Sequence, residues 1–144
     1  DSVSDFDANI WRVRYESIRN LEKHLANNGT TIIKIFLNIS KKEQKKRFLD
    51  RINEQEKNWK FSMGDLPERA LWDEYMKAYE KAINETSKDH APWFVIPGDD
   101  KWFARVAAIQ IIIDALEGMN LKFPKLSAED QKALEGARKQ LERE

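Results

Sequence analysis

The stretch from residue 47 to residue 69 concentrates side chains that can bind phosphate groups. It carries five cations: Arg47, Arg51, Lys57, Lys60 and Arg69. Arg47 and Arg51 are four residues apart, which places them on the same face of a helix. Phosphoryl transfer is catalysed mainly by positioning and by neutralising negative charge, so mobile cations between two helices suit a lid over phosphates. The stretch is therefore a candidate phosphate site.

The same stretch also fits a solvated helical surface. Acidic residues alternate with the cations: Asp50, Glu54, Glu56, Asp65 and Glu68. Paired surface charges contribute about 0–1 kcal/mol to stability and need no functional role. Asp65 in particular is expected to cap the helix that follows it. Composition alone favours this alternative over a phosphate site.

Hydrophobic periodicity predicts a helix within the first thirty residues. Apolar side chains recur there at three- and four-residue steps, at Trp11, Tyr15, Ile18, Leu21 and Leu25. Asp7 is the expected N-cap, and Asn28-Gly29 ends the helix because glycine tolerates the left-handed conformation. The apolar, β-branched segment 31–39 then predicts a strand covered on both faces. Lys34 interrupts this segment, so its ammonium must reach either a partner or water at the end of the sheet.

The cationic stretch lies on the helices that follow this strand. Ser40 and Glu43 form a capping box, which predicts a helix over about 41–52. Residues 53–64 are polar and are expected to form a loop. Asp65 is then expected to open a long helix, whose wide apolar stripe suits packing against two neighbours.

The last third of the chain predicts a second strand and two more helices. WFVIP at 93–97 is a short apolar strand, and the helix expected over about 101–117 is apolar on almost every side. The order of elements implies an α/β fold with a right-handed parallel crossover. Because two strands cannot bury so apolar a helix, we expect a partial sheet of two adjacent parallel strands. Its apolar edge is expected to be either exposed or covered by another chain. A highly charged tail helix is expected from Ser127 to about residue 143.

Composition limits the class of protein. A chain of 144 residues is normally one domain, and its formal net charge is zero. Any attraction for a polyanion must then come from a local cluster, and the cations lack the density and aromatic interleaving of a nucleic-acid surface. No cysteine is present, which excludes disulfides and thiolate metal sites and fits a reducing compartment. No apolar run approaches the roughly 20 residues of a membrane span, and no signal-peptide pattern is visible.

A phosphate-binding loop of the Walker A type is absent from this sequence. Its five glycines are scattered, at Gly29, Gly64, Gly98, Gly118 and Gly136, and none is followed by Lys-Ser or Lys-Thr. The chain also begins at Asp1 without a methionine, so we expect a processed or truncated piece.

Three blocks of the sequence resemble polyphosphate kinases of family 2. They are IIKIFLNISKKEQKKRFLDR at 32–51, NWKFSMGDLPERALWDEY at 58–75 and TSKDHAPWFVIPGDDKWFAR at 86–105, and their order and spacing match as well. The resemblance covers about residues 10–124. The wording FSMGDLPERALWDEY and the continuation LKFPK resemble the subgroup that phosphorylates nucleoside mono- and diphosphates.

This resemblance implies a domain organisation and a reaction. Residues 1–124 would be the C-terminal part of a P-loop kinase-like domain with a helical lid at about 41–86, and residues 125–144 a charged helical tail. The parent protein would transfer phosphoryl groups between inorganic polyphosphate and AMP, ADP or GDP, with Mg²⁺. It is expected to be cytoplasmic and homo-oligomeric, without nucleic-acid or membrane partners. The family's Walker A loop and Walker B aspartate precede the matched part, so the chain itself is expected to be inactive.

The resemblance also assigns roles to individual residues. It favours a phosphate site at residues 47–69 over the solvated helical surface that composition alone favours. Arg51 and Lys60 are expected to contact phosphate, and Asp65 to act as a lid acid that caps or orients; these three form the predicted catalytic set. Lys34, Arg47 and Arg69 are the predicted supporting cations of substrate binding, and no metal-ligating residue is assigned.

Two other functions remain open at this stage. One is a noncatalytic helical module that binds a polyanion or a protein partner, which the missing loop favours for the isolated chain. The other is a nucleotide kinase that uses ATP as the phosphate donor. A Gly-x-Asp-x-x-Gly-Lys segment encoded upstream of Asp1 would support the polyphosphate kinase.

Overall fold

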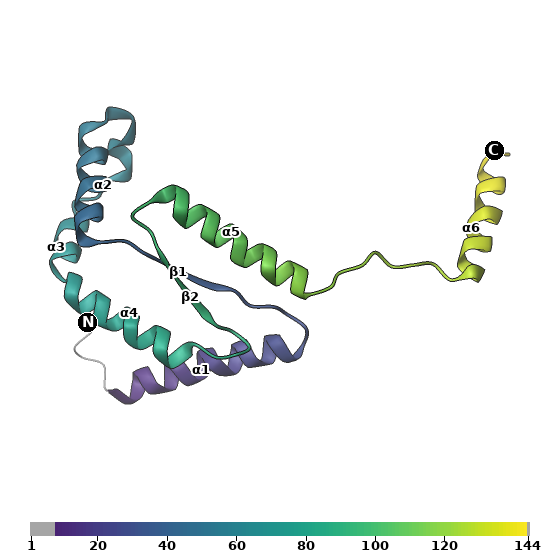
Figure 1. Ribbon diagram of the computed structural model, residues 1–144, viewed down its shortest axis with the longest axis horizontal. Coiled ribbons are helices and arrows are strands. Elements are labelled where there is room, and N and C mark those ends of the chain that lie inside the picture. The colour runs from purple at the N-terminus through teal and green to yellow at the C-terminus, as the bar shows by residue number, and fades with distance from the viewer. Residues whose placement is uncertain (1–7, 144) are drawn as a thin grey trace. The chain divides into compact units, whose positions relative to one another are not determined.

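The computed structural model describes residues 8–143 and divides the chain into two compact units, which meet after Ile113 (Figure 1). The elements follow one another as α1 (Ala8–Asn27), β1 (Lys34–Asn38), α2 (Lys41–Asn53), the 3₁₀ helix η2 (Gln55–Lys60), α3 (Asp65–Ala70), α4 (Trp72–Thr86), β2 (Trp93–Pro97), α5 (Lys101–Gly118) and α6 (Ala128–Leu141). The expected N-cap Asp7 lies outside the described residues.

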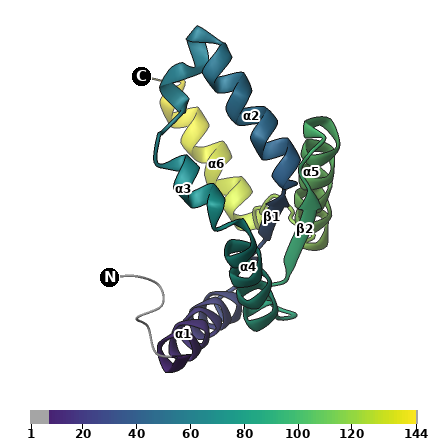
Figure 2. The ribbon, with the colours of Figure 1, turned by 90° about the vertical axis from the view of Figure 1, so that its left-hand side faces the viewer.

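The sheet consists of β1 and β2, which pair in parallel. Their register runs from Lys34 opposite Trp93 to Asn38 opposite Pro97. The predicted pair of adjacent parallel strands is therefore confirmed. The first strand is shorter than the predicted 31–39 because its ladder extends only as far as β2 supplies partners. Helices α1 and α4 lie on one side of the strands and α5 on the other (Figure 2).

An ion pair buried beneath the sheet joins β1 to the helices on that side. Lys34 Nζ lies 2.8 Å from both carboxylate oxygens of Glu22 on α1, and 2.8 Å from the carbonyl oxygen of Thr86 at the end of α4. The same ammonium lies 5.3 Å from the ring centre of Trp93 on β2. Of the two interpretations of this lysine, the structure supports the one in which its ammonium reaches a partner.

Helix α2 begins at the predicted place, with one difference at its cap. Ser40 Oγ accepts a hydrogen bond from the amide of Glu43 at 3.0 Å, as a capping box requires. The reciprocal bond is replaced, because the amide of Ser40 donates to Asp99 Oδ1 at 2.6 Å. The Glu43 carboxylate instead pairs with Arg47. The capping box is therefore only half formed, since a residue from a distant loop competes for the Ser40 amide.

The segment after α2 differs from the prediction in three respects. Residues 55–60 form a 3₁₀ helix within the predicted loop. Asp65 is the first residue of α3 and not its cap; Gly64 holds the cap position and makes no side-chain bond. The predicted long helix breaks at Leu71, whose φ of −84° and ψ of 21° depart from helical values. Its amide bonds three residues back to Glu68, so α3 closes and α4 starts afresh.

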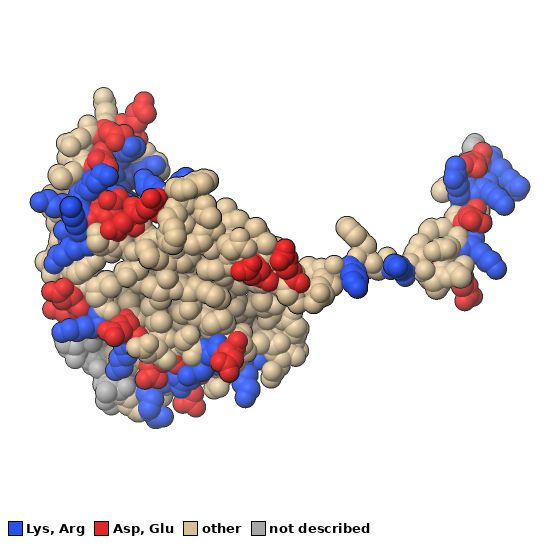
Figure 3. Space-filling model, in the orientation of Figure 1, with Lys and Arg blue, Asp and Glu red and all other residues tan. Residues whose placement is uncertain are grey.

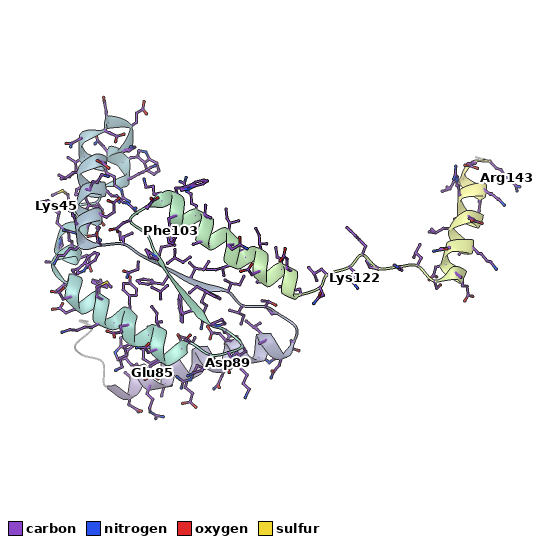
Figure 4. All side chains as sticks on the ribbon, in the orientation of Figure 1. Lys45, Glu85, Asp89, Phe103, Lys122 and Arg143 are labelled. Carbon is purple, nitrogen blue, oxygen red and sulfur yellow. The ribbon has the colours of Figure 1, made fainter. Side chains whose placement is uncertain are left out.

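Helix α5 carries apolar side chains around its circumference, as predicted. Trp102 is 75% exposed, and Ala104 is the buried residue of this helix. Phe103, labelled in Figure 4, lies near the start of α5 and is half exposed. Figure 3 shows a broad surface without charged side chains over this part of the first unit. Leu37 of β1 and Val95 of β2 are also exposed, so the two-stranded sheet leaves apolar side chains uncovered, in line with the predicted exposed apolar edge.

The second unit contains the end of α5 and the charged helix α6. Ser127 caps α6 by accepting the amide of Asp130 at 3.0 Å, as the sequence predicts. Leu134 and Leu141, the two apolar anchors of this helix, are exposed within the unit. Across residues 8–143, no helix combines the length and hydropathy that a membrane crossing needs.

Candidate functional site

The predicted cations lie mostly on a helical arm, defined as residues 41–70 and formed by α2, η2 and α3. The arm is held together at its tip, where α2 meets η2. Asn58 Nδ2 donates to the carbonyl oxygens of Arg51 and Ile52 at 2.8 Å each, which satisfies two groups at the end of α2. The rings of Phe48 and Phe61 meet edge to face with centres 5.8 Å apart. The tip is thus a closed turn that can present side chains.

The structure brings Arg51 and Lys60 together at this tip. Arg51 Nη1 lies 3.4 Å from the carbonyl oxygen of Lys60, and its guanidinium stacks 5.6 Å from the Phe48 ring centre. Lys60 Nζ lies 5.1 Å from the ring centre of Trp59, which is 78% exposed. Within residues 8–143, neither cation forms a salt bridge with a carboxylate. Both charges are therefore available to an anion.

The third cation of the tip region is already paired. Lys57 lies on η2 and forms a salt bridge with Glu54, three residues earlier. Lys57 is exposed like Lys60, but its charge is balanced by Glu54. This difference makes Lys57 the natural control for any experiment on Arg51 or Lys60.

Arg47 and Arg69 lie at the base of the arm, where their donors bind protein groups. Arg47 Nε donates to Glu43 Oε1 at 2.9 Å, and its Nη2 donates to the carbonyl of Gly98 at 2.7 Å. Arg69 Nη1 reaches back from α3 to the Lys41 carbonyl and to Gln44 Oε1, at 2.9 and 2.7 Å. These contacts tie α3 and the loop after β2 to the first turns of α2.

A cavity of about 310 Å³ lies beside the base of the arm, next to the carboxyl half of β1. It is lined by thirteen residues: Phe36, Leu37, Asn38, Ile39, Gln44, Phe48, Asp65, Glu68, Arg69, Trp72, Tyr75, Met76 and Tyr79. Ligands of open α/β sheets bind outside the carboxyl ends of the strands, which is where this cavity opens. Asp65 and Arg69 are the predicted site residues that line it. The cavity thus combines an aromatic wall with one acid and one base from the predicted set.

Two titratable groups of this region, Tyr75 and Asp99, have shifted pKa values. Tyr75 donates its hydroxyl to Glu68, and this hydrogen bond, with the nearby negative charge, raises the pKa of Tyr75. The pKa of Asp99 is lowered, mainly because its carboxylate accepts the backbone amide of Ser40. The Arg47 charge lowers the pKa of Asp99 further.

The lowered pKa of Asp99 makes stability depend on acidity. A carboxyl group whose pKa is lower in the folded protein adds stability above its unfolded pKa of about 3.9, and this stability is lost as pH falls through the folded value. As pH is lowered below about 4, the free energy of unfolding of the wild type should therefore decrease more steeply than that of Asp99→Asn. Urea unfolding at several pH values between about 3 and 6 measures the difference. Identical slopes for the two proteins would contradict it.

Lys34 is the predicted site residue that the structure sets apart. It begins β1, whereas the arm follows the carboxyl end of that strand. Its ammonium has three donors, and Glu22 Oε1, Glu22 Oε2 and Thr86 O accept them. The side chain is only 11% exposed. A phosphate contact would require Lys34 to leave these partners.

The residues that the structure describes do not form a metal site of three or more protein ligands. Residues 8–143 contain no cluster of three or more His, Asp or Glu side chains that could hold a metal. Mg²⁺ is usually held by one or two carboxylates together with substrate phosphates, so single acids and pairs of acids stay candidates. No residue of this chain is assigned to Mg²⁺.

Asp99 is a residue of the site that sequence reasoning missed. In the sequence it belongs to the turn Gly98-Asp99-Asp100 before α5, where either aspartate can cap the helix. The structure separates them: Asp100 accepts the amides of Trp102 and Phe103, whereas Asp99 turns toward Ser40. The two consecutive aspartates were the available signal for a second capping residue. The local sequence pattern does not show which of them faces the loop after β1.

Comparison with known proteins identifies relatives of this chain. The family model described as polyphosphate kinase 2 (PPK2) matches residues 1–124. The ADP-polyphosphate phosphotransferase of Rhodopseudomonas palustris is 50% identical over 137 residues, which cover 95% of this chain and 47% of that protein. The AMP/ADP-polyphosphate phosphotransferase of Meiothermus ruber is 46% identical over 123 residues, or 85% of this chain and 46% of that protein.

A solved structure supports the same relationship. The crystal structure of polyphosphate kinase 2 from Arthrobacter aurescens TC1 matches with a TM-score of 0.83 and 47% identity, covering 90% of this chain and 46% of that one. The predicted fold class, a partial P-loop kinase fold with two parallel strands, is confirmed. The chain spans about half the length of each of these three relatives.

Proposed function

This chain belongs to the polyphosphate kinase 2 family, and on that basis we propose that it takes part in phosphoryl transfer between inorganic polyphosphate and nucleotides. AMP and ADP are the nucleotides that the names of its relatives support, and GDP is a further candidate from the sequence. The observation that carries the proposal is the pair of cations Arg51 and Lys60, which share the tip of the arm without carboxylate partners among the described residues. A noncatalytic module is not favoured, because the two relatives named above are polyphosphate phosphotransferases.

The helical arm is the lid of this reaction in our proposal. Its tip carries unbalanced positive charge, and its base lies beside the cavity at the carboxyl half of β1. A lid of this kind would place Arg51 and Lys60 over the phosphates bound near the strand ends, where their charge opposes that of the transferred group. Asp65 and Arg69 line the cavity below and would orient the substrate. Mg²⁺, homo-oligomeric assembly and a cytoplasmic location remain predictions.

Polyphosphate binding by this chain tests the role of the tip. A hydrogen bond to a charged group contributes about 1.5–3 kcal/mol, so Lys60→Ala should weaken polyphosphate binding by roughly 10- to 100-fold. Arg51→Ala should weaken binding less, because we propose that the Arg51 contact strengthens in the transition state. Fluorescence anisotropy of end-labelled polyphosphate, at fixed ionic strength, measures the dissociation constants.

Lys57→Ala is the matched control, because it removes one positive charge from η2, the short helix that also carries Lys60, while its partner Glu54 already neutralises that charge. Its affinity for polyphosphate should stay within about twofold of the wild type. Equal losses of affinity in Lys57→Ala and Lys60→Ala would show nonspecific attraction to cations and would overturn the assignment of the tip.

The chain by itself should not catalyse phosphoryl transfer. It has no Walker A pattern, and in P-loop enzymes the backbone amides and lysine of that loop hold the transferred phosphate. We therefore expect no measurable polyphosphate-dependent phosphorylation of AMP or ADP by the purified 144-residue chain, even though it binds polyphosphate. An assay by chromatography of the nucleotides checks this. Robust turnover, free of contaminating kinase, would refute the account of the missing loop.

A further inference from the structure

The loops that follow the two strands are joined directly to each other. The amide of Gly98, after β2, donates to the carbonyl oxygen of Asn38 at the end of β1, at 2.7 Å. Further along the two loops, the amide of Ser40 donates to Asp99 Oδ1 at 2.6 Å. Ser40 is the residue that caps α2. The carboxylate of Asp99 therefore holds the first residue of the arm.

These contacts continue through α2 and return to the same loop. Ser40 Oγ accepts the amide of Glu43, and Glu43 Oε1 accepts Arg47 Nε at 2.9 Å. Arg47 Nη2 then donates to the carbonyl oxygens of Gly98 and Asp99, at 2.7 and 3.3 Å. We call these five residues, Ser40, Glu43, Arg47, Gly98 and Asp99, the α2 anchor. Its members close a ring that joins the first two turns of α2 to the loop after β2.

The close approach of the two loops explains the glycine at position 98. A Cβ atom there would lie 2.8 Å from Ile39 Cγ2 and 3.4 Å from the Asn38 carbonyl oxygen. The first distance is shorter than normal van der Waals contact, so a side chain at this position would force Ile39 or the loops to shift. Glycine therefore favours the close approach in which the Asp99 carboxylate reaches the Ser40 amide.

We propose that Asp99 is a positioning residue, which holds the root of α2 on the loop after β2 and thereby sets where the arm carries Arg51 and Lys60. The proposal rests on the proposed function for the role of those two cations, but the anchor itself is independent of any ligand. The negative charge of Asp99 also lies at the amino end of α2, where the helix dipole favours it. The anchor is local, so its loss should loosen the arm before it loosens the sheet.

Hydrogen exchange of this chain tests the anchor without using a substrate. In Asp99→Ala, the amides of residues 44–53 should exchange at least about tenfold faster than in the wild type, while those of β1 and β2 change by less than about twofold. Asp99→Asn retains a side-chain oxygen that can accept the Ser40 amide, so its exchange rates should stay within about threefold of the wild type. Unchanged rates in Asp99→Ala, or an equal increase throughout the chain, would overturn the anchor.

The neighbouring aspartate provides a matched control. Asp100 caps α5 by accepting the amides of Trp102 and Phe103 at 2.8 and 3.1 Å, and it contributes nothing to the α2 anchor. Asp100→Ala should accelerate exchange in the first turn of α5 and leave residues 44–53 unchanged. If it loosens α2 as much as Asp99→Ala does, the effect is general destabilisation and the specific role of Asp99 is excluded.

A kinetic measurement distinguishes positioning from stability alone. In a catalytically competent protein that contains this sequence, Asp99→Ala should lower kcat by up to about 100-fold through misplacement of the arm, and Asp99→Asn should restore most of it. The dissociation constant for polyphosphate should change by less than about threefold, because Arg51 and Lys60 remain. Normal kcat together with accelerated exchange in Asp99→Ala would reject the positioning role. If the wild-type chain did not bind polyphosphate, the proposed function would be rejected and the anchor would still stand.

Discussion

Replacing Arg51 by alanine is expected to lower kcat for phosphoryl transfer by up to roughly 10³–10⁵ in a catalytically competent protein that contains this sequence. The guanidinium lies at the arm tip, and its polar contact within residues 8–143 is a 3.4 Å approach to the Lys60 carbonyl. Its charge is therefore not committed to a carboxylate among residues 8–143. If Arg51 meets the phosphate only when charge develops in the transition state, kcat falls and KM changes little.

Lys60→Ala should give the complementary result. An ammonium that only holds the polyphosphate chain contributes equally to the ground state and the transition state, so its loss raises KM for polyphosphate and leaves kcat nearly unchanged. Steady-state kinetics of both variants measures the split, with the melting temperature as a check on folding and Lys57→Ala as the charge control. Wild-type kcat and KM in both variants would show that the arm tip is a solvated surface without a role in the reaction.

Replacing Lys34 by alanine should destabilise the fold by about 3–5 kcal/mol. The ammonium and the Glu22 carboxylate lie 2.8 Å apart, and each side chain is only 11% exposed. Removing one partner of such a pair leaves the other charge buried without compensation, which is more costly than the pair is worth. Urea unfolding followed by circular dichroism measures the loss of free energy.

Two further variants distinguish a stranded charge from general loss of packing. Replacing both partners by apolar residues, in Lys34→Met combined with Glu22→Leu, should be less destabilising than Lys34→Ala. Arg19→Ala is the control for a more exposed ion pair, since Arg19, with 28% of its side chain exposed, pairs at 3.5 Å with Glu85 at the end of α4 (Figure 4). It should change stability by about 1 kcal/mol or less. A loss no greater than that in Lys34→Ala would show that the buried pair is not a structural anchor.

The elements with strong local signals were predictable from the sequence. Ser40 marks the start of α2 and Ser127 the start of α6, and both caps form as expected. The apolar segments around 34–38 and 93–97 pair as two parallel strands. The excess of apolar side chains on α5 also predicted a sheet too small to cover it. Each of these features depends on residues within a few positions of one another, or on their total apolar content.

The break between α3 and α4 was not predictable in the same way. The apolar rows of Leu71 and Trp72 continue through the break, so periodicity alone indicates one long helix. The structure interrupts the helix at Leu71, between the segment that folds back onto α2 through Arg69 and the segment that packs on β1 through Tyr79. The two halves have different neighbours, and the sequence does not specify neighbours.

By itself the sequence determined which charges this protein has, which helices carry them and that its sheet is incomplete, because those properties follow from residue type and spacing. Only the tertiary structure decided which of these charges bind partners within the protein. Lys34 and Glu22 are twelve residues apart and become one buried pair, while Arg47 and Asp99 join the base of the arm to a loop about fifty residues away. Arg51 and Lys60 meet at the tip and keep their charge unbalanced. The physical reason is that hydrogen bonds and ion pairs act over a few ångströms in space, and separation along the chain does not reveal that distance.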